Sequence, residues 1–201
     1  MIRCTFVNNQ VLSIYKNLPS IKFPLDPSTV LSLFPNCRFM SYAAFGKITN
    51  ISIEEVCILC ESRFGCTHYE MKNNRYLVLC NQSTKNNNNL GRQRWTFAHE
   101  IGHIVCGHIE NSAKEKICDS FCSTLSEREN ETEADYFAMN LLAPLPLIRH
   151  LNIRSVTELQ DVFGLSTEAS INTFKKFLKW NGNHYKTAWE NDLIRTYLSK
   201  Q

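Results

Sequence analysis

Two histidines four positions apart, His99 and His103, constrain the fold of this chain more than any other feature. Side chains at positions i and i+4 lie on one face of an α-helix. Apolar residues surround the pair and would pack such a helix onto a core: Trp95, Phe97, Ala98, Ile101, Ile104 and Val105. We therefore expect a helix over about residues 92–107 that presents two imidazoles side by side.

Glu100 lies directly after the first of these histidines, so residues 99–103 spell HEIGH. Two imidazoles on one helical face can hold a single zinc ion. Bound zinc lowers the pKa of a water molecule, and a neighbouring carboxylate can take its proton. We predict that His99 and His103 bind Zn²⁺ and that Glu100 is the general base of peptide hydrolysis. The alternative is an ordinary surface helix that carries two histidines.

A zinc site of this kind needs a third protein ligand, and residues 131–135 are the best source. Glu131 and Asp135 share one face of a helix expected over about residues 126–142. We predict that Glu131 binds the metal and that Asp135 accepts the ring N–H of a ligating histidine. Glu133 would then point away. The alternative is a solvated acidic face.

A different zinc pattern can be excluded by counting along the helix. A protease helix with three histidines would need glycine at position 106 and histidine at position 109. This chain has Cys106 and Ile109 there. His108 is therefore expected at the helix end or in solvent, and Cys106 is expected to be buried.

The nine cysteines are odd in number and irregular in spacing. The first residues lack a basic start followed by an apolar stretch, so we expect no export signal and a cytoplasmic protein. Reduced thiols, mostly buried, are then the expected state. The alternative is a second metal site built from Cys57, Cys60, Cys66 and Cys80, although these residues contain only one C-x-x-C pair.

The region before the histidine helix should contain a helix and a hairpin. Ser52 resembles a helix N-cap, and we expect its helix to run to about Arg63 and to stop at Gly65. Residues 66–71 and 75–80 alternate like two strands of a hairpin. We expect the second strand to offer a free edge to an extended peptide. Earlier residues should form loops and a short helix over residues 11–18.

Composition narrows the functional classes. A length of 201 residues suggests one domain, with or without an appendage. The net charge of +3 is too small to indicate nucleic-acid binding. No apolar run approaches the roughly 18 residues of a membrane span. We expect neither direct nucleic-acid binding nor a membrane segment, and composition leaves the oligomeric state open.

Residues 155–180 have helix-turn-helix spacing around Gly164, followed by a weaker helix over residues 189–198. One interpretation is DNA binding through three lysines at positions 175, 176 and 179. Residues 149–201 hold eight Lys or Arg and five Asp or Glu, a surplus of only three. We therefore favour packing or repressor docking, with Phe174, Phe177 and Leu178 in the core.

Four segments resemble the ImmA/IrrE family of metallopeptidases. They are RQRWTFAHEIGHIVCGH at 92–108, ETEADYFAMNLLAP at 131–144, YLVLCN at 76–81 and LQDVFGLSTEAS at 159–170. The resemblance covers about residues 50–180. The family often has asparagine where this chain has Asp135.

The resemblance implies an α+β fold. This would be a mainly helical metallopeptidase domain with a small antiparallel sheet beside the zinc-binding helices, plus a C-terminal helix-turn-helix-like segment. We expect an N-terminal extension at 1–50, a metallopeptidase core at 51–150 and the helical segment at 151–201. The resemblance also implies a cytoplasmic zinc protease from a mobile element or stress locus that acts on helix-turn-helix transcriptional repressors.

The sequence thus predicts a zinc endopeptidase with Glu100 as base. The main alternative is a zinc-containing regulator that binds a repressor or DNA without cleaving it. A zinc-dependent amidase or deacylase would share the same ligands. Such sites usually carry a further donor to the oxyanion. His68, Tyr69 and Tyr136 are the candidates, and nothing in the sequence separates them.

Overall fold

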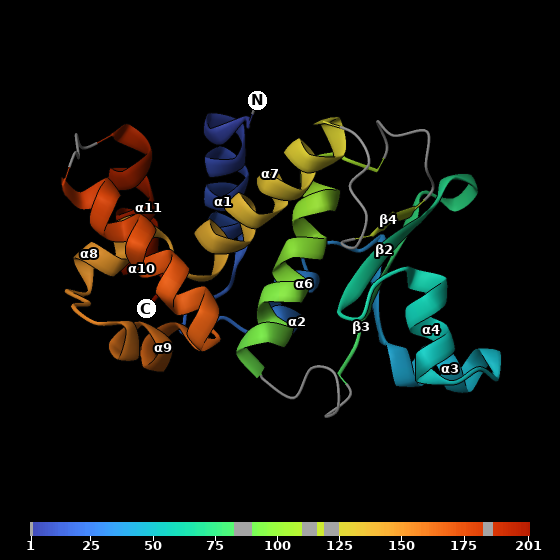
Figure 1. The fold of residues 1–201 in the computed structure, drawn as a ribbon. Coiled ribbons are helices and arrows are strands. Elements are labelled where there is room, and N and C mark those ends of the chain that lie inside the picture. The colour runs from blue at the N-terminus through green and yellow to red at the C-terminus, as the bar shows by residue number, and fades with distance from the viewer. Residues whose placement is uncertain (1, 83–89, 110–115, 119–124, 183–186) are drawn as a thin grey trace.

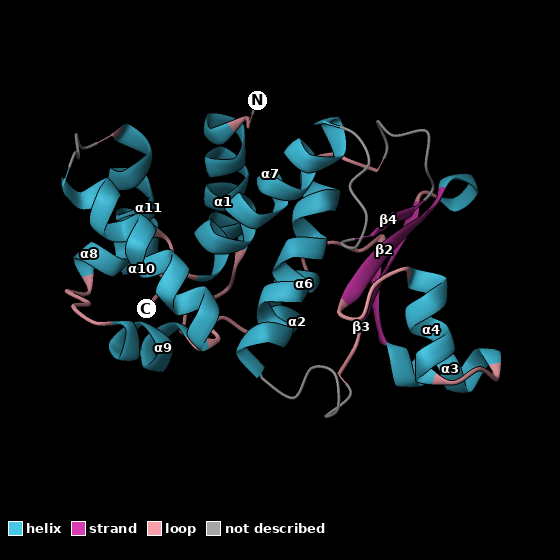
Figure 2. Cartoon of the chain, in the orientation of Figure 1, coloured by secondary structure: helices cyan, strands magenta, loops and turns pink. Residues whose placement is uncertain are grey.

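The computed structural model describes residues 2–82, 90–109, 116–118, 125–182 and 187–201. These residues form a mainly helical α+β fold (Figures 1 and 2). The helices are α1 (Cys4–Asn17), α2 (Pro27–Leu31), α3 (Tyr42–Thr49), α4 (Ile53–Cys60), α6 (Leu90–Val105), α7 (Leu125–Leu142), α8 (Leu145–His150), α9 (Val156–Phe163), α10 (Thr167–Gly182) and α11 (Ala188–Ser199).

One small sheet accompanies the helices. Its strands are β1 (Cys37–Ser41), β2 (Gly65–Glu70), β3 (Arg75–Cys80) and β4 (Lys116–Cys118), in the order β1-β3-β2-β4. The β2–β3 hairpin is confirmed, with a short 3₁₀ turn at Met71–Asn73. The expectation of an antiparallel sheet is wrong, because β1 pairs with β3 in parallel. The hairpin's second strand lies between β1 and β2, and it runs in the same direction as β1.

The predicted free edge at residues 75–80 is also wrong. Strand β3 pairs with β1 on one side and with β2 on the other, so both of its backbone edges are used. Most of its side chains are buried or half-buried, as expected for a central strand. Among the described strands, the sheet edges are β1 and β4.

The sheet lies between two helical layers, with α6 on one face and α3 and α4 on the other (Figure 1). A small apolar core fills the second interface and includes Tyr42, Val56, Cys60, Cys66 and Leu79. The larger core joins α6 and α7 to α1 and to the C-terminal helices. Three of the four cysteines considered as metal ligands, Cys60, Cys66 and Cys80, are therefore core residues.

Helix α4 begins as predicted and ends earlier. The Ser52 hydroxyl accepts from the backbone N–H of Glu55, and the Glu55 carboxylate accepts from the backbone N–H of Ser52, which forms a capping box. The helix stops at Glu61, whose φ is 51°. Gly65, the expected stop, instead opens strand β2 opposite Cys80.

The first fifty residues are more ordered than the sequence indicated. Helix α1 covers Cys4–Asn17 rather than a short stretch, and it packs against α7 and α11. The Tyr15 hydroxyl donates to the Leu141 carbonyl at 2.8 Å, and the Trp189 indole donates to the Asn8 carbonyl at 2.6 Å. The N-terminal helix is thus joined to elements far along the chain.

The C-terminal helices appear close to their predicted positions. Helix α9 ends at Gly164, whose φ of 62° favours glycine, and α10 follows. Phe177 is buried and Phe174 partly so, but Leu178 is 56% exposed, so its predicted place in the core is wrong. No described helix has both the length and the apolar character that crossing a membrane requires.

Helices α6 and α7 approach closely at Gly102. A Cβ atom there would lie 3.1 Å from both Ala134 Cα and Phe137 Cδ1. This distance is tighter than ordinary van der Waals contact. The glycine therefore sets the spacing of the two helices that carry the predicted site residues.

Replacing Gly102 with valine should lower the free energy of unfolding by about 1–3 kcal/mol, the usual cost of overpacking a core. Chemical denaturation followed by circular dichroism measures this change. The matched control is Gly182→Val, because among the described residues no atom lies within 4 Å of a Cβ at that position. Equal midpoints for the two variants would contradict the close packing.

Candidate metal centre

Helices α6 and α7 lie against each other in the middle of the molecule and carry all five predicted site residues (Figure 1). The first helix supplies His99, Glu100 and His103, and the second supplies Glu131 and Asp135. Both helices match the predicted ranges within two residues. The i, i+4 spacing in each helix directs the side chains toward the partner helix.

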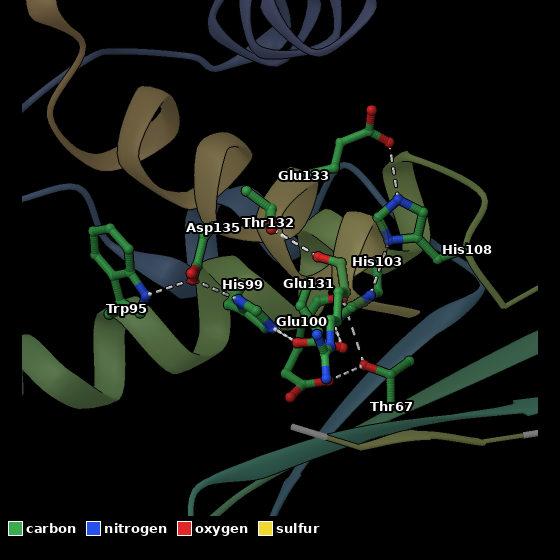
Figure 3. Close-up of polar contacts among 11 residues, drawn as sticks. Thr67, Trp95, His99, Glu100, His103, His108, Glu131, Thr132, Glu133 and Asp135 are labelled. Atoms are coloured by element: carbon green, nitrogen blue, oxygen red, sulfur yellow. Dashed lines mark hydrogen bonds and ion pairs between the residues drawn. The ribbon is translucent and has the colours of Figure 1, made fainter. Parts of the chain in front are cut away.

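Three side chains converge on one point between the helices (Figure 3). The Nε2 atoms of His99 and His103 are 3.0 Å apart. The Glu131 carboxylate lies 3.1 Å from the first of these nitrogens and 3.5 Å from the second. Both histidines are buried.

The partner of His99 defines its tautomer. Its Nδ1 lies 3.0 Å from Asp135 Oδ1, and an ionised carboxylate can only accept a hydrogen bond. The hydrogen therefore sits on Nδ1, and Nε2 carries a lone pair. The Trp95 indole donates to the same Asp135 oxygen at 3.4 Å. The predicted contact between Asp135 and a histidine ring is thus present in the structure.

A longer chain of contacts defines the tautomer of His103. Its Nδ1 lies 2.9 Å from His108 Nδ1, and His108 Nε2 lies 2.9 Å from Glu133 Oε2. A neutral His108 ring places its hydrogen on Nε2, because the Glu133 carboxylate that faces this nitrogen is an acceptor and also accepts from Arg3. The ring donates from Nε2 to the carboxylate and accepts at Nδ1. His103 therefore donates from Nδ1 and also keeps its lone pair on Nε2.

This donor set fits a metal cation. Two imidazole lone pairs at 3.0 Å would repel each other unless a cation were shared between them. The Glu131 carboxylate brings a negative charge to the same point, which a bound cation would also neutralise. Two imidazole nitrogens and one carboxylate are a donor set typical of catalytic zinc sites.

Glu100 lies beside these three side chains and is buried. The Thr67 hydroxyl, from strand β2, donates to Glu100 Oε2 at 2.6 Å (Figure 3). Sequence reasoning missed Thr67, because only the position of β2 against α6 identifies it. The sheet therefore helps to orient the carboxylate that was predicted to act as base.

A groove of about 730 Å³ opens onto the centre. His99, Glu131 and Asp135 line it together with Arg92 and Trp95 of α6 and Lys176 of α10. Arg92 also lies 3.7 Å from Glu168 of α10 in an exposed ion pair. Helix α10 thus forms one wall of the groove, a role that the sequence did not indicate.

Other predicted side chains lie outside this cluster. The Tyr69 hydroxyl donates to Asn74 and the Tyr136 hydroxyl donates to Asn8, while His68 is exposed on β2. His108 follows the helix end but is buried, so the expectation of a solvent position is wrong. It is buried because it fits between His103 and Glu133.

Glu133 points away from Glu131, as predicted, but it does not face solvent. It is buried and binds Arg3 and His108. Burial would raise its pKa, but hydrogen bonds from these two residues lower that pKa to about 2. The alternative of a solvated acidic face is therefore wrong for Glu131 and Glu133.

The cysteines agree with the expectation of reduced and mostly buried thiols. The seven whose side chains are described form no disulfide, and five of them are buried, including Cys106. Cys60 and Cys66 have their sulfur atoms 2.9 Å apart within the small core. In the described part of the chain, residues 57, 60, 66 and 80 do not group as metal ligands.

Comparison with known protein families identifies this chain's similarity to a peptidase family. The model described as the IrrE N-terminal-like domain, Peptidase M78, matches residues 75–175. The matched region begins at β3 and includes α6, α7 and the first half of α10. No curated protein sequence matches the chain.

Proposed function

The chain belongs to the IrrE N-terminal-like family of metallopeptidases, and on that premise we propose that it is a zinc-dependent endopeptidase. A metallopeptidase is a hydrolase, and its substrate is a protein or peptide. We assign His99, His103 and Glu131 as the zinc ligands. Glu100 is the general base, and Asp135 orients His99.

One observation carries this proposal. The lone pairs of two imidazoles and an ionised carboxylate meet at one point, directly beside Glu100 and at the side of a groove. An open position is what separates a catalytic zinc site from a structural one. Three protein ligands would leave such a position for a water molecule.

Bound zinc would supply a water molecule of lowered pKa and would polarise the scissile carbonyl. Glu100 takes the proton of that water and later delivers it to the nitrogen of the leaving amine. The Thr67 hydroxyl orients the carboxylate that takes and returns this proton. The groove binds the substrate chain, with α10 as its second wall.

The Thr67 contact leads to a testable expectation. Thr67→Val removes the hydroxyl that orients Glu100 and should lower kcat about 10–100-fold, the value of a hydrogen bond to a charged group. Thr67→Ser keeps a hydroxyl and should retain most of the activity. Both variants should bind zinc normally. Wild-type kcat in Thr67→Val would contradict the positioning role of Thr67.

We further propose that the substrate is a helix-turn-helix transcriptional repressor, inside the cell that makes the enzyme. The support is the resemblance of segments 92–108 and 131–144 to peptidases of that kind. The competing function is a zinc-containing regulator that binds a repressor or DNA without cleavage. Both functions predict relief of repression, so only the chemistry distinguishes them.

The test compares cells that express the wild type with cells that express Glu100→Gln. New protein N-termini are mapped by mass spectrometry, and repressor-controlled transcripts are counted. The proposal predicts new N-termini within a helix-turn-helix protein in the wild type only, together with derepression in the wild type only. Derepression by Glu100→Gln without any cleavage would establish the regulator instead. Released acyl groups without new N-termini would indicate an amidase or deacylase.

A further inference from the structure

A line of hydrogen bonds leads from His103 away from the groove, through the buried His108 and Glu133, to Arg3 at the surface. His103 contacts His108, and His108 contacts Glu133 (Figure 3). Glu133 then accepts from Arg3, through the guanidinium Nε at 3.1 Å and the backbone N–H at 2.7 Å. This line joins the end of α6, the middle of α7 and the residue that precedes α1.

The two middle members of this line are buried, and each has hydrogen-bond partners. His108 and Glu133 are each 3% exposed. A buried carboxylate is costly unless it is paired and hydrogen-bonded. Arg3 supplies the pairing and also donates from Nη2 to the Cys106 carbonyl at 2.8 Å. The guanidinium therefore ties the carboxylate to the last turn of the helix that bears His103.

The cluster could be interpreted instead as a second metal site, because Cys106, His108 and Glu133 place ligand atoms within 4.8 Å of one another. Three observations oppose that interpretation. Both ring nitrogens of His108 already have partners. The Arg3 guanidinium occupies the Glu133 carboxylate, where it would repel a cation. Burial raises the pKa of the Cys106 thiol to about 12, which opposes a thiolate ligand.

We propose that His108, Glu133 and Arg3 are positioning residues that hold His103 in its Nδ1–H tautomer and aim its Nε2 lone pair at the metal position. The inference rests on the proposed function only for the identity of that metal. His99 is oriented by a half-exposed carboxylate, Asp135. His103 is oriented by the His108 ring, which in turn contacts the buried Glu133 carboxylate. The N-terminal segment thereby takes part in forming the site.

The first test needs no metal and no variant. Long-range proton–nitrogen NMR on zinc-free protein with ¹⁵N-labelled histidine reports which ring nitrogen of each histidine bears hydrogen. The proposal predicts Nδ1–H for His103 and Nε2–H for His108. A His103 ring with hydrogen on Nε2 would overturn it.

The second test measures zinc affinity by competition with a chelator. His108→Leu should weaken zinc binding about 10–100-fold, the usual loss when the partner of a ligating histidine is removed. His108→Asn should recover most of this loss, because an amide oxygen can accept from His103 Nδ1. The matched control is His68→Leu, an exposed histidine that should bind zinc like the wild type. Unchanged affinity in His108→Leu would overturn the proposal.

The outcomes separate this inference from the proposed function. A protein that shows the predicted tautomers and affinity losses but cleaves nothing would keep the positioning role and lose the peptidase assignment. A second zinc per chain that disappears in Cys106→Ser would replace the positioning role by a metal site, whatever the activity. If His108→Leu fails to fold, the tautomers of His103 and His108 in the wild type still test the positioning role.

Discussion

Glu100→Gln should lower kcat about 10²–10⁴-fold, the usual contribution of general acid–base catalysis. The amide has the shape of the carboxylate but cannot take a proton from water. Its oxygen can still accept from Thr67, so the fold and the contact with β2 should remain. Steady-state cleavage of a peptide that contains the mapped site measures the effect.

Zinc content and affinity serve as the internal check on this variant. Both should match the wild type, because Glu100 is not one of the three assigned ligands. Glu54→Gln, an exposed residue on α4, is the matched substitution and should be fully active. A Glu100→Gln enzyme with near wild-type kcat would show that another group acts as base.

Glu131→Ala should weaken zinc binding by more than about 100-fold and abolish cleavage. Even the outer partners of metal ligands contribute about 10–100-fold, so a direct ligand should contribute more. Zinc content after dialysis against a mild chelator measures the effect. The matched control is Glu129→Ala, an exposed residue on the same helix, which should retain zinc.

The comparison also tests which acidic residue of α7 is the ligand. Glu133 faces Arg3 and His108 rather than the two Nε2 atoms. Retention of zinc in Glu131→Ala would contradict the ligand assignment and would require a different third donor.

The parts of the site that could be predicted from sequence are those that depend on helical spacing alone. His99 with His103, and Glu131 with Asp135, share a face because four residues make about one turn. Once two such helices pack together, their polar faces meet. The contact between Asp135 and His99 needs no other element, and the sequence anticipated it.

The missed parts depend on contacts between distant segments. Thr67 is 33 positions from Glu100, and Arg3 is 130 positions from Glu133. No local pattern marks such pairs. Strand β1 was missed for the same reason. Its parallel pairing with β3 makes the sheet mixed and covers the edge that was expected to be free.

The C-terminal segment shows that helix-turn-helix spacing alone does not identify a function. Two consecutive helices lie where helix-turn-helix spacing predicted them, and nothing in the structure identifies them as a DNA-binding module. Helix α10 instead lines the groove, to which Lys176, Asp135 and Glu131 all contribute side chains. The division into segments 1–50, 51–150 and 151–201 stays a prediction.

Anomalous diffraction at the zinc edge from crystals of the purified protein tests the central claim most directly. The account predicts one zinc peak per chain, within bonding distance of His99 Nε2, His103 Nε2 and the Glu131 carboxylate. A zinc peak at Cys106, His108 and Glu133, or no peak from zinc-supplied protein at neutral pH, would contradict it.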